Sequence, residues 1–147
     1  HLSVDYDNGP LSVGASYLAA QGDVDGSLWG IAAKYNFGMF ALIGQFEQAD
    51  EDYVGAVINS DLYGDTTAYA LGGELYLGNN TLRATYGHVD DDGDDGSVWT
   101  LGAEHNFSKR TRIFAEYEDS ELNRMKHGDH YHESDGQRFG VGIRHDF

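Results

Sequence analysis

Residues 138–147 read Arg138-Phe139-Gly140-Val141-Gly142-Ile143-Arg144-His145-Asp146-Phe147, and this stretch carries the strongest indication of the fold. Positions 139, 141, 143 and 147 are apolar, whereas positions 138, 144 and 146 are charged, which is the period-two pattern of a β-strand with two unlike faces. Chain termini usually fray in water, so a soluble protein gains little from a final aromatic residue. A membrane β-barrel places such a strand in lipid and anchors its end at the interface. The stretch therefore predicts a transmembrane strand.

The composition is compatible with such a barrel and excludes several other classes. Mean hydropathy is -0.51, and no run reaches the ~18 apolar residues of a membrane-spanning helix, but a barrel strand crosses with only ~9–11 residues. Twenty Gly, ten Tyr and seven Phe against one Pro favour strands over helices. The absence of Cys removes disulfides, thiol catalysis and Cys-type zinc sites. The net charge of -16 argues against nucleic-acid binding.

The rest of the chain divides into nine segments with strand patterns. These segments are residues 1–7, 10–20, 27–37, 39–48, 66–78, 81–89, 97–107, 111–119 and 136–147. Tight connections at 8–10, 38, 78–80 and 108–110 alternate with long acidic ones at about 21–26, 49–65, 90–96 and 120–135. Short turns at one end and long loops at the other are typical of outer-membrane barrels. We therefore predict an all-β, antiparallel transmembrane β-barrel.

Large apolar residues recur at two fixed depths along the predicted strands. Each full-length strand that follows a long loop carries one such residue near its start and another eight positions later. The pairs are Trp29 and Phe37, Tyr69 and Leu77, Trp99 and Phe107, and Phe139 and Phe147. Eight steps of ~3.3 Å, at a tilt of ~40°, span about 20 Å, close to the ~25 Å apolar band of such barrels. The spacing predicts two interfacial girdles on one face.

The opposite face of the predicted strands is small or charged. Its charged positions are candidates for lining a lumen: Lys34, Glu47, Glu74, Arg83, Glu104, Arg112, Glu116, Arg138 and Arg144. Opposed charges across a wet pore favour small polar solutes over apolar ones. The same residues would also fit a second interpretation, in which cross-strand ion pairs stiffen the wall. Both interpretations imply a polar, water-filled interior.

The final strand and the repeated girdle spacing resemble Gram-negative outer-membrane general diffusion porins, over most of the 147 residues. The resemblance implies a homotrimeric channel for small hydrophilic solutes and ions, among outer-membrane lipid and lipopolysaccharide, with no cofactor and no enzymatic step. It also implies that Phe139, Val141, Ile143 and Phe147 form the signal recognised by the barrel-assembly machinery. His145 departs from the Tyr usual in the family.

Nine strands conflict with the even strand number of bacterial single-chain barrels. General porins have sixteen strands, so residues 1–147 are expected to be the C-terminal portion of one porin β-barrel domain. The loop that forms the constriction would then lie in an N-terminal half. The acidic balance predicts cation preference that weakens as salt screens the charges.

Other functions have weaker sequence support. Catalysis has none of the expected motifs: no Gly-x-Ser-x-Gly, no phosphate-binding Gly loop and no His-Glu-x-x-His. The tract 126–133, with His127, His130 and His132, would suit a transition metal or be a plain surface loop, and the tract 90–96 would suit loose calcium binding or be a solvated acidic loop. We predict no metal. A non-conducting barrel that acts as anchor, adhesin or receptor through its acidic loops is the alternative function, and a soluble β-sandwich is a second rival.

Overall fold

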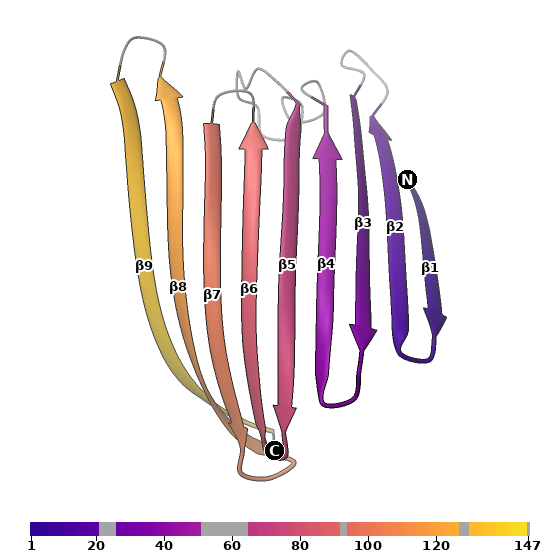
Figure 1. Cartoon of the computed structure of the whole chain (residues 1–147), viewed down its shortest axis with the longest axis vertical. Helices are drawn as coiled ribbons and strands as arrows, with labels where there is room; N and C mark the ends of the chain where they lie inside the picture. Colours follow the sequence, from indigo (N-terminus) through magenta and orange to yellow (C-terminus); the bar gives the residue numbers. More distant parts are fainter. Residues whose placement is uncertain (21–25, 51–64, 92–93, 127–129, 147) are drawn as a thin grey trace.

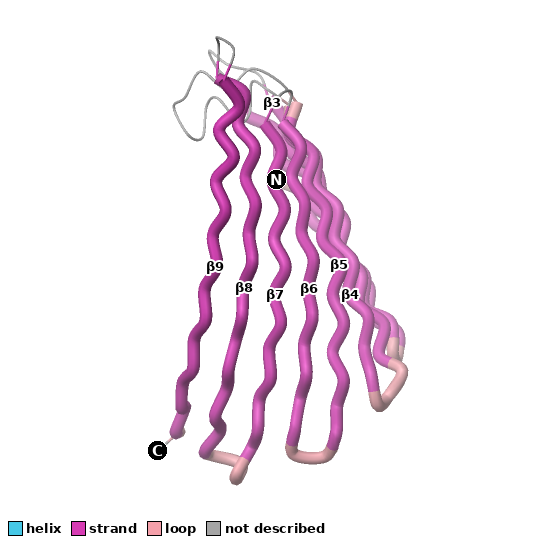
Figure 2. The backbone as a smooth tube through the Cα atoms, turned by 60° about the vertical axis from the view of Figure 1, so that its left-hand side comes forward, coloured by secondary structure: helices cyan, strands magenta, loops and turns pink. Residues whose placement is uncertain are grey.

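A computed structural model describes residues 1–20, 26–50, 65–91, 94–126 and 130–146 of the chain. Within them nine strands form a single antiparallel sheet in which each strand pairs with its neighbour in sequence (Figure 1). The strands are β1 (Leu2–Asn8), β2 (Leu11–Ala20), β3 (Gly26–Asn36), β4 (Phe40–Ala49), β5 (Thr66–Leu77), β6 (Asn80–Asp91), β7 (Asp94–Asn106), β8 (Thr111–Lys126) and β9 (His130–His145). The sheet curves from β9 round to β3 (Figure 2). The prediction of an all-β antiparallel fold is confirmed.

The short connections all lie at one end of the sheet, and the other connections lie at the opposite end (Figure 1). Gly9, Gly38 and Gly78 occupy three of these turns with positive φ values of 60°, 94° and 62°. Glycine adopts such angles without the steric cost that a Cβ imposes. These residues therefore fix the positions of three hairpins, as their turn chemistry predicts.

Two unlike faces follow from the register of the sheet. Side chains alternate between the faces along a strand, and directly paired residues share a face. The pairs Gly44 with Leu71 and Tyr86 with Trp99 lie on what we call the apolar face. Glu74 pairs with Arg83 on the other, which we call the polar face. The register thus preserves the alternation along the whole sheet.

Neither face is covered by a second layer within the described residues. Ala41 and Ala49 are the only buried hydrophobic residues among them, although 40% of the sequence is hydrophobic. Large side chains such as Leu71, Trp99 and Phe139 are 63%, 55% and 72% exposed. A sandwich would bury such residues between two sheets. The soluble-sandwich hypothesis is therefore wrong.

The strands on either side of two predicted long loops extend further than the sequence suggests. β8 runs to Lys126 and β9 begins at His130, so most of the predicted loop 120–135 is paired strand. The predicted loop 90–96 is likewise mostly strand, since Asp90 pairs with Asp95 and Asp91 with Asp94. Both segments were predicted as loops because their side chains are polar. The hydrogen bonds between paired strands are made by the backbone, so they form whichever side chains the strands carry.

Parts of the His-rich and acidic tracts lie outside the described residues. These parts are residues 127–129 and 92–93, and the side chains of 94, 124–126 and 130–134 are likewise not described. Among the described side chains, no group of three or more His, Asp or Glu is arranged to hold a metal ion. No helix within the described ranges is long and apolar enough to cross a membrane.

Candidate functional site

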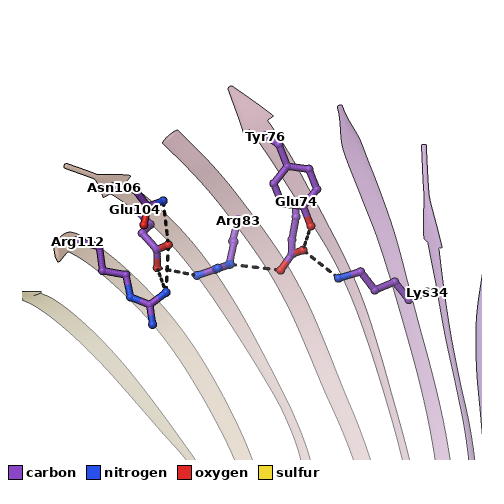
Figure 3. A network of polar contacts seen from close by, with 7 residues as sticks. All are labelled: Lys34, Glu74, Tyr76, Arg83, Glu104, Asn106 and Arg112. Carbon is purple, nitrogen blue, oxygen red and sulfur yellow. Dashed lines mark hydrogen bonds and ion pairs between the residues drawn. The ribbon is translucent and has the colours of Figure 1, made fainter. Parts of the chain in front are cut away.

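A row of five charged side chains crosses the polar face near the short turns. We call it the charged row, and it consists of Lys34, Glu74, Arg83, Glu104 and Arg112 (Figure 3). The residues come from β3, β5, β6, β7 and β8, and their signs alternate from one residue to the next. Each carboxylate thus lies between two cations.

Glu74 is shared by the first two cations of the charged row. It lies directly opposite Arg83, whose Nε is 3.3 Å from Glu74 Oε1. Lys34 Nζ reaches over β4 to within 3.1 Å of Glu74 Oε2, and the Tyr76 hydroxyl donates to the same oxygen. Ala41, which pairs with Glu74 on the strand between, is fully buried. A small residue at that position leaves room for the lysine.

Glu104 is shared in the same way at the other end of the charged row. Arg112 Nη1 lies 3.4 Å and Arg83 Nη1 3.8 Å from Glu104 Oε2, and the Asn106 amide donates to Oε1 over 3.5 Å. The side chains of Glu104 and Glu74 are only 11% and 18% exposed, whereas the three cations are 35% to 48% exposed. The carboxylates therefore lie low against the sheet and the cationic groups face outward from it.

The remaining predicted charged residues occupy the same face with different partners. Arg138 Nε lies 3.6 Å from Glu118 Oε1, its direct partner in the register. Arg144 Nε lies 3.1 Å from Asp146 Oδ1. Glu47 and Glu116 make no ion pair with any described residue. Within the described part of the chain, two carboxylates of the polar face therefore have no cation at short range.

The sequence pattern did not mark Phe114, although it is the largest apolar side chain of the polar face in the lower part of β8. It pairs with Glu104 on β7 and with Gly142 on β9. A Cβ added at Gly142 would come within 2.8 Å of Phe114 Cε1, so the ring lies directly over this glycine. Arg112 and Phe114 are two residues apart on β8, so the alternation of side chains alone would have placed Phe114 on the same face as Arg112.

Aromatic residues form a continuous band on the apolar face, which we call the aromatic belt. Tyr17 pairs with Trp29 and Tyr86 with Trp99, and ring centroids lie 5.3 Å apart for Trp29 and Phe46 and 4.5 Å apart for Tyr86 and Trp99. The belt contains one residue from each of eight strands: Tyr17, Trp29, Phe46, Tyr69, Tyr86, Trp99, Tyr117 and Phe139. The predicted girdle at this depth is therefore present.

A second aromatic group lies at the short-turn end of the same face. Ring centroids of Tyr35 and Phe37, and of Phe37 and Phe40, are each 4.4 Å apart, and His105 contacts Phe107 at 4.7 Å. This group occupies the depth of the second predicted girdle, whose last member, Phe147, lies outside the described residues.

The predicted assembly-signal residues line one side of the last strand. Phe139, Val141 and Ile143 occupy the apolar face of β9 and are 72%, 71% and 69% exposed. Phe147, the fourth predicted member, is not described. The structure thus presents three of the four side chains as one exposed apolar stripe.

Comparison with known proteins gives relatives of one kind. A family model described as "Gram-negative porin" matches residues 1–124. "Outer membrane porin protein 32" of Delftia acidovorans is 34% identical over 122 residues, which cover 76% of this chain and 32% of that protein. A porin structure refined at 1.8 Å resolution superposes with a TM-score of 0.71 at 21% identity, covering 99% of this chain and 50% of that one.

A second solved structure agrees with the first. In-vitro folded OmpT, an outer membrane protein of Vibrio cholerae, superposes with a TM-score of 0.70 at 21% identity over 97% of this chain and 53% of its own. The chain therefore spans about a third of the length of the curated relative and about half that of the two solved structures.

Proposed function

The chain belongs to the Gram-negative porin family of the bacterial outer membrane, and from this premise we propose that its protein forms a water-filled channel for passive diffusion of small hydrophilic solutes and ions. The observation that carries the proposal is that the two faces of one sheet require different surroundings. The aromatic belt and the exposed aliphatic residues suit lipid, whereas the charged row requires water. A sheet with lipid on one side and water on the other suits the wall of a water-filled channel.

The polar face is then the lumen face, and its charged residues are the proposed pore lining. They are the nine residues Lys34, Glu47, Glu74, Arg83, Glu104, Arg112, Glu116, Arg138 and Arg144, all of which share this face by register. The ion pairs of the charged row support a stiffened wall, and its outward cationic groups also give the lumen a charged surface. The two interpretations of these residues are therefore compatible.

Residues 1–147 are proposed to be the C-terminal portion of a sixteen-stranded barrel. Within the described residues β1 pairs only with β2 and β9 only with β8, so each leaves one edge of its backbone unpaired. Unpaired edges are not tolerated in lipid. Strands from elsewhere in the protein would satisfy both edges, which agrees with the half-length coverage of the solved structures. A homotrimer, contacts with lipopolysaccharide and use of the barrel-assembly machinery complete the proposal.

The sign of the selectivity follows from the charge of the chain. Its net charge of -16 attracts cations and repels anions at the channel mouths. At about 0.1 M salt the Debye length is about 10 Å and at about 1 M it is about 3 Å. We therefore propose cation preference that declines as salt is raised.

Channel activity is tested with single-channel recording in a planar bilayer, on the full-length protein that carries this chain. We expect stepwise openings in groups of three and a cation-selective reversal potential under a KCl gradient. A barrel that inserts correctly but stays silent would exclude the channel and favour the role of anchor, adhesin or receptor through the acidic loops.

The lumen assignment has a separate test with a matched control. Arg83 and Leu82 are neighbours on β6 but lie on the polar and apolar faces. The chain has no Cys of its own, so Arg83→Cys and Leu82→Cys can each be probed with a charged, membrane-impermeant thiol reagent. We expect rapid modification and a change of conductance for Arg83→Cys alone. Equal labelling of both variants would contradict the assignment of faces.

A further inference from the structure

The charges of the polar face fall into two groups at different depths. Within three residues of a short-turn strand end lie the four cations Lys34, Arg83, Arg112 and Arg144. Glu74, Glu104, Asp5 and Asp7 occupy the same depth range on the same face. This lower group is therefore close to charge balance, although the whole chain is strongly acidic.

Further from the short turns the balance changes. Glu47, Glu116, Glu118 and Arg138 lie five to seven residues from the short-turn ends of their strands, so three carboxylates accompany one cation at that depth. Glu118 contacts Arg138, whereas Glu47 and Glu116 have no ion pair within the described part of the chain. The upper group thus carries an excess of negative charge.

Both signs of charge occur on the polar face beyond the upper group, where the register places Arg124, opposite Asp94, and Lys126. Asp91 shares the polar face at the far end of β6, and Asp50 and Asp65 follow and precede the strands at that end. Asp90 and Asp95 oppose one another there on the apolar side. The excess of carboxylates is therefore clearest at the depth of the upper group, while the short-turn end is nearly neutral.

We propose that this chain's part of the wall generates cation preference at the long-connection end only, and that the open channel consequently rectifies. This inference rests on the proposed channel function. Short turns are periplasmic in bacterial barrels, so the selective end is the extracellular one. Glu47 and Glu116 are the residues that set the preference, because neither forms an ion pair with a cation of the described residues.

The direction of rectification follows from ion transport through two zones in series. The acidic zone passes mostly cations, and the balanced zone passes cations and anions alike. When the voltage drives cations from the acidic zone into the balanced zone, cations carry most of the current up to the junction but only part of it beyond. Anions that reach the junction from the balanced zone are excluded from the acidic zone. Salt therefore accumulates inside the pore and raises the current, whereas the opposite voltage depletes it. The larger current runs from the extracellular end toward the periplasmic end.

The experiment is a current–voltage measurement on the full-length protein in a planar bilayer with equal KCl on both sides. The side of insertion is fixed by Asn79→Cys, which lies in a short turn and is modified from one chamber only by a thiol reagent too large to pass through the channel. We compare the wild type, the double variant Glu47→Gln with Glu116→Gln, and the control Glu121→Gln. Glu121 pairs with Ser97 on the apolar face of β7 and β8, so Glu121→Gln removes one negative charge outside the proposed lumen.

We expect the ratio of currents at opposite voltages to exceed unity at about 0.1 M KCl and to return to unity at about 1 M KCl, where the Debye length falls to about 3 Å. In the double variant the current ratio should fall most of the way to unity, and the reversal potential measured under a KCl gradient should shift toward zero. Glu121→Gln should behave as the wild type in both measurements. A linear, cation-selective channel would overturn the inference and leave the channel function intact. Equal effects of the double variant and the control would also overturn it. A silent barrel would instead overturn the proposed function.

Discussion

The packing of Phe114 on Gly142 allows a prediction in which one methyl group is added to the polar face. A Cβ at Gly142 would lie 2.8 and 2.9 Å from the Cε1 and Cε2 atoms of the Phe114 ring, inside van der Waals contact. Gly142→Ala must therefore move the ring off the strand. Because the Phe114 side chain is 43% exposed already, the ring can turn outward from the polar face, but it then loses its packed side.

The magnitude follows from the surface that the ring would expose. Roughly a quarter of the ~200 Å² that a Phe buries is about 50 Å², which at about 25 cal/mol/Å² corresponds to about 1 kcal/mol. Residual overpacking adds to this loss, since inserting a methyl group into a packed site costs about 1–3 kcal/mol. We therefore expect Gly142→Ala to lower the free energy of unfolding by about 2–4 kcal/mol.

Gly140 provides the matched control on the same strand and face. Nothing lies within 4 Å of a Cβ placed there, and its φ is not among the positive values. Gly140→Ala should be neutral or stabilise by about 0.5 kcal/mol, because alanine restricts the unfolded chain. The double variant Gly142→Ala with Phe114→Ala removes the obstructing ring, so the methyl group should cost nothing further in that background.

Urea unfolding in detergent or lipid vesicles, followed by Trp fluorescence and by heat-modifiable gel mobility, gives the five free energies that are needed. These are the values for the wild type, Gly142→Ala, Gly140→Ala, Phe114→Ala and the double variant. The double-mutant cycle then isolates the interaction between positions 114 and 142. If Gly142→Ala and Gly140→Ala were equally stable, or if the penalty at Gly142 persisted without the ring, the packing described here would be wrong.

Three further predictions concern the charged row, a turn and the aromatic belt. Glu74→Gln should lower the free energy of unfolding by about 1 kcal/mol, since Lys34 and Arg83 lose a shared partner; added salt should shrink the difference from wild type, and an unchanged difference would show that charge is not its cause. Gly38→Ala should cost about 1 kcal/mol in urea unfolding because its φ of 94° strains an L-residue, and a neutral result would contradict that turn geometry. Trp99→Ala should weaken the barrel by about 1 kcal/mol through its lost contact with Tyr86; the melting temperature should fall in vesicles, and an unchanged value would argue against an interfacial role of the belt.

The alternation of side chains made most of the fold predictable. Residues 138–147 alone indicate a strand with lipid on one side, and the eight-residue spacing from Trp29 to Phe37 places two girdles that the structure contains. The ends of β8 and β9 were not predictable in this way, because the strand continues through polar residues once the apolar band has ended. Pairing there depends on backbone hydrogen bonds, which leave little trace in hydropathy.

The site was predictable as a set of residues but not as a set of contacts. Parity alone identified the five members of the charged row as sharing one face. The reach of Lys34 over β4 to Glu74 depends on the stagger between strands and on the small size of Ala41, neither of which period-two alternation encodes. The partner of Arg138 follows from the register, which sets it opposite Glu118.

The charged row also has a mechanical consequence. Its members belong to three successive hairpins, β3–β4, β5–β6 and β7–β8, and its contacts from Lys34 to Glu74 and from Arg83 to Glu104 join each hairpin to the next. Without such contacts, a pulling force applied at one end of the chain would extract a barrel from the membrane one hairpin at a time. A hairpin is the smallest unit that can be extracted, because its two strands are joined by a short turn. These side-chain ties couple the three, so force-extension traces should contain one longer step where three shorter ones would occur without them.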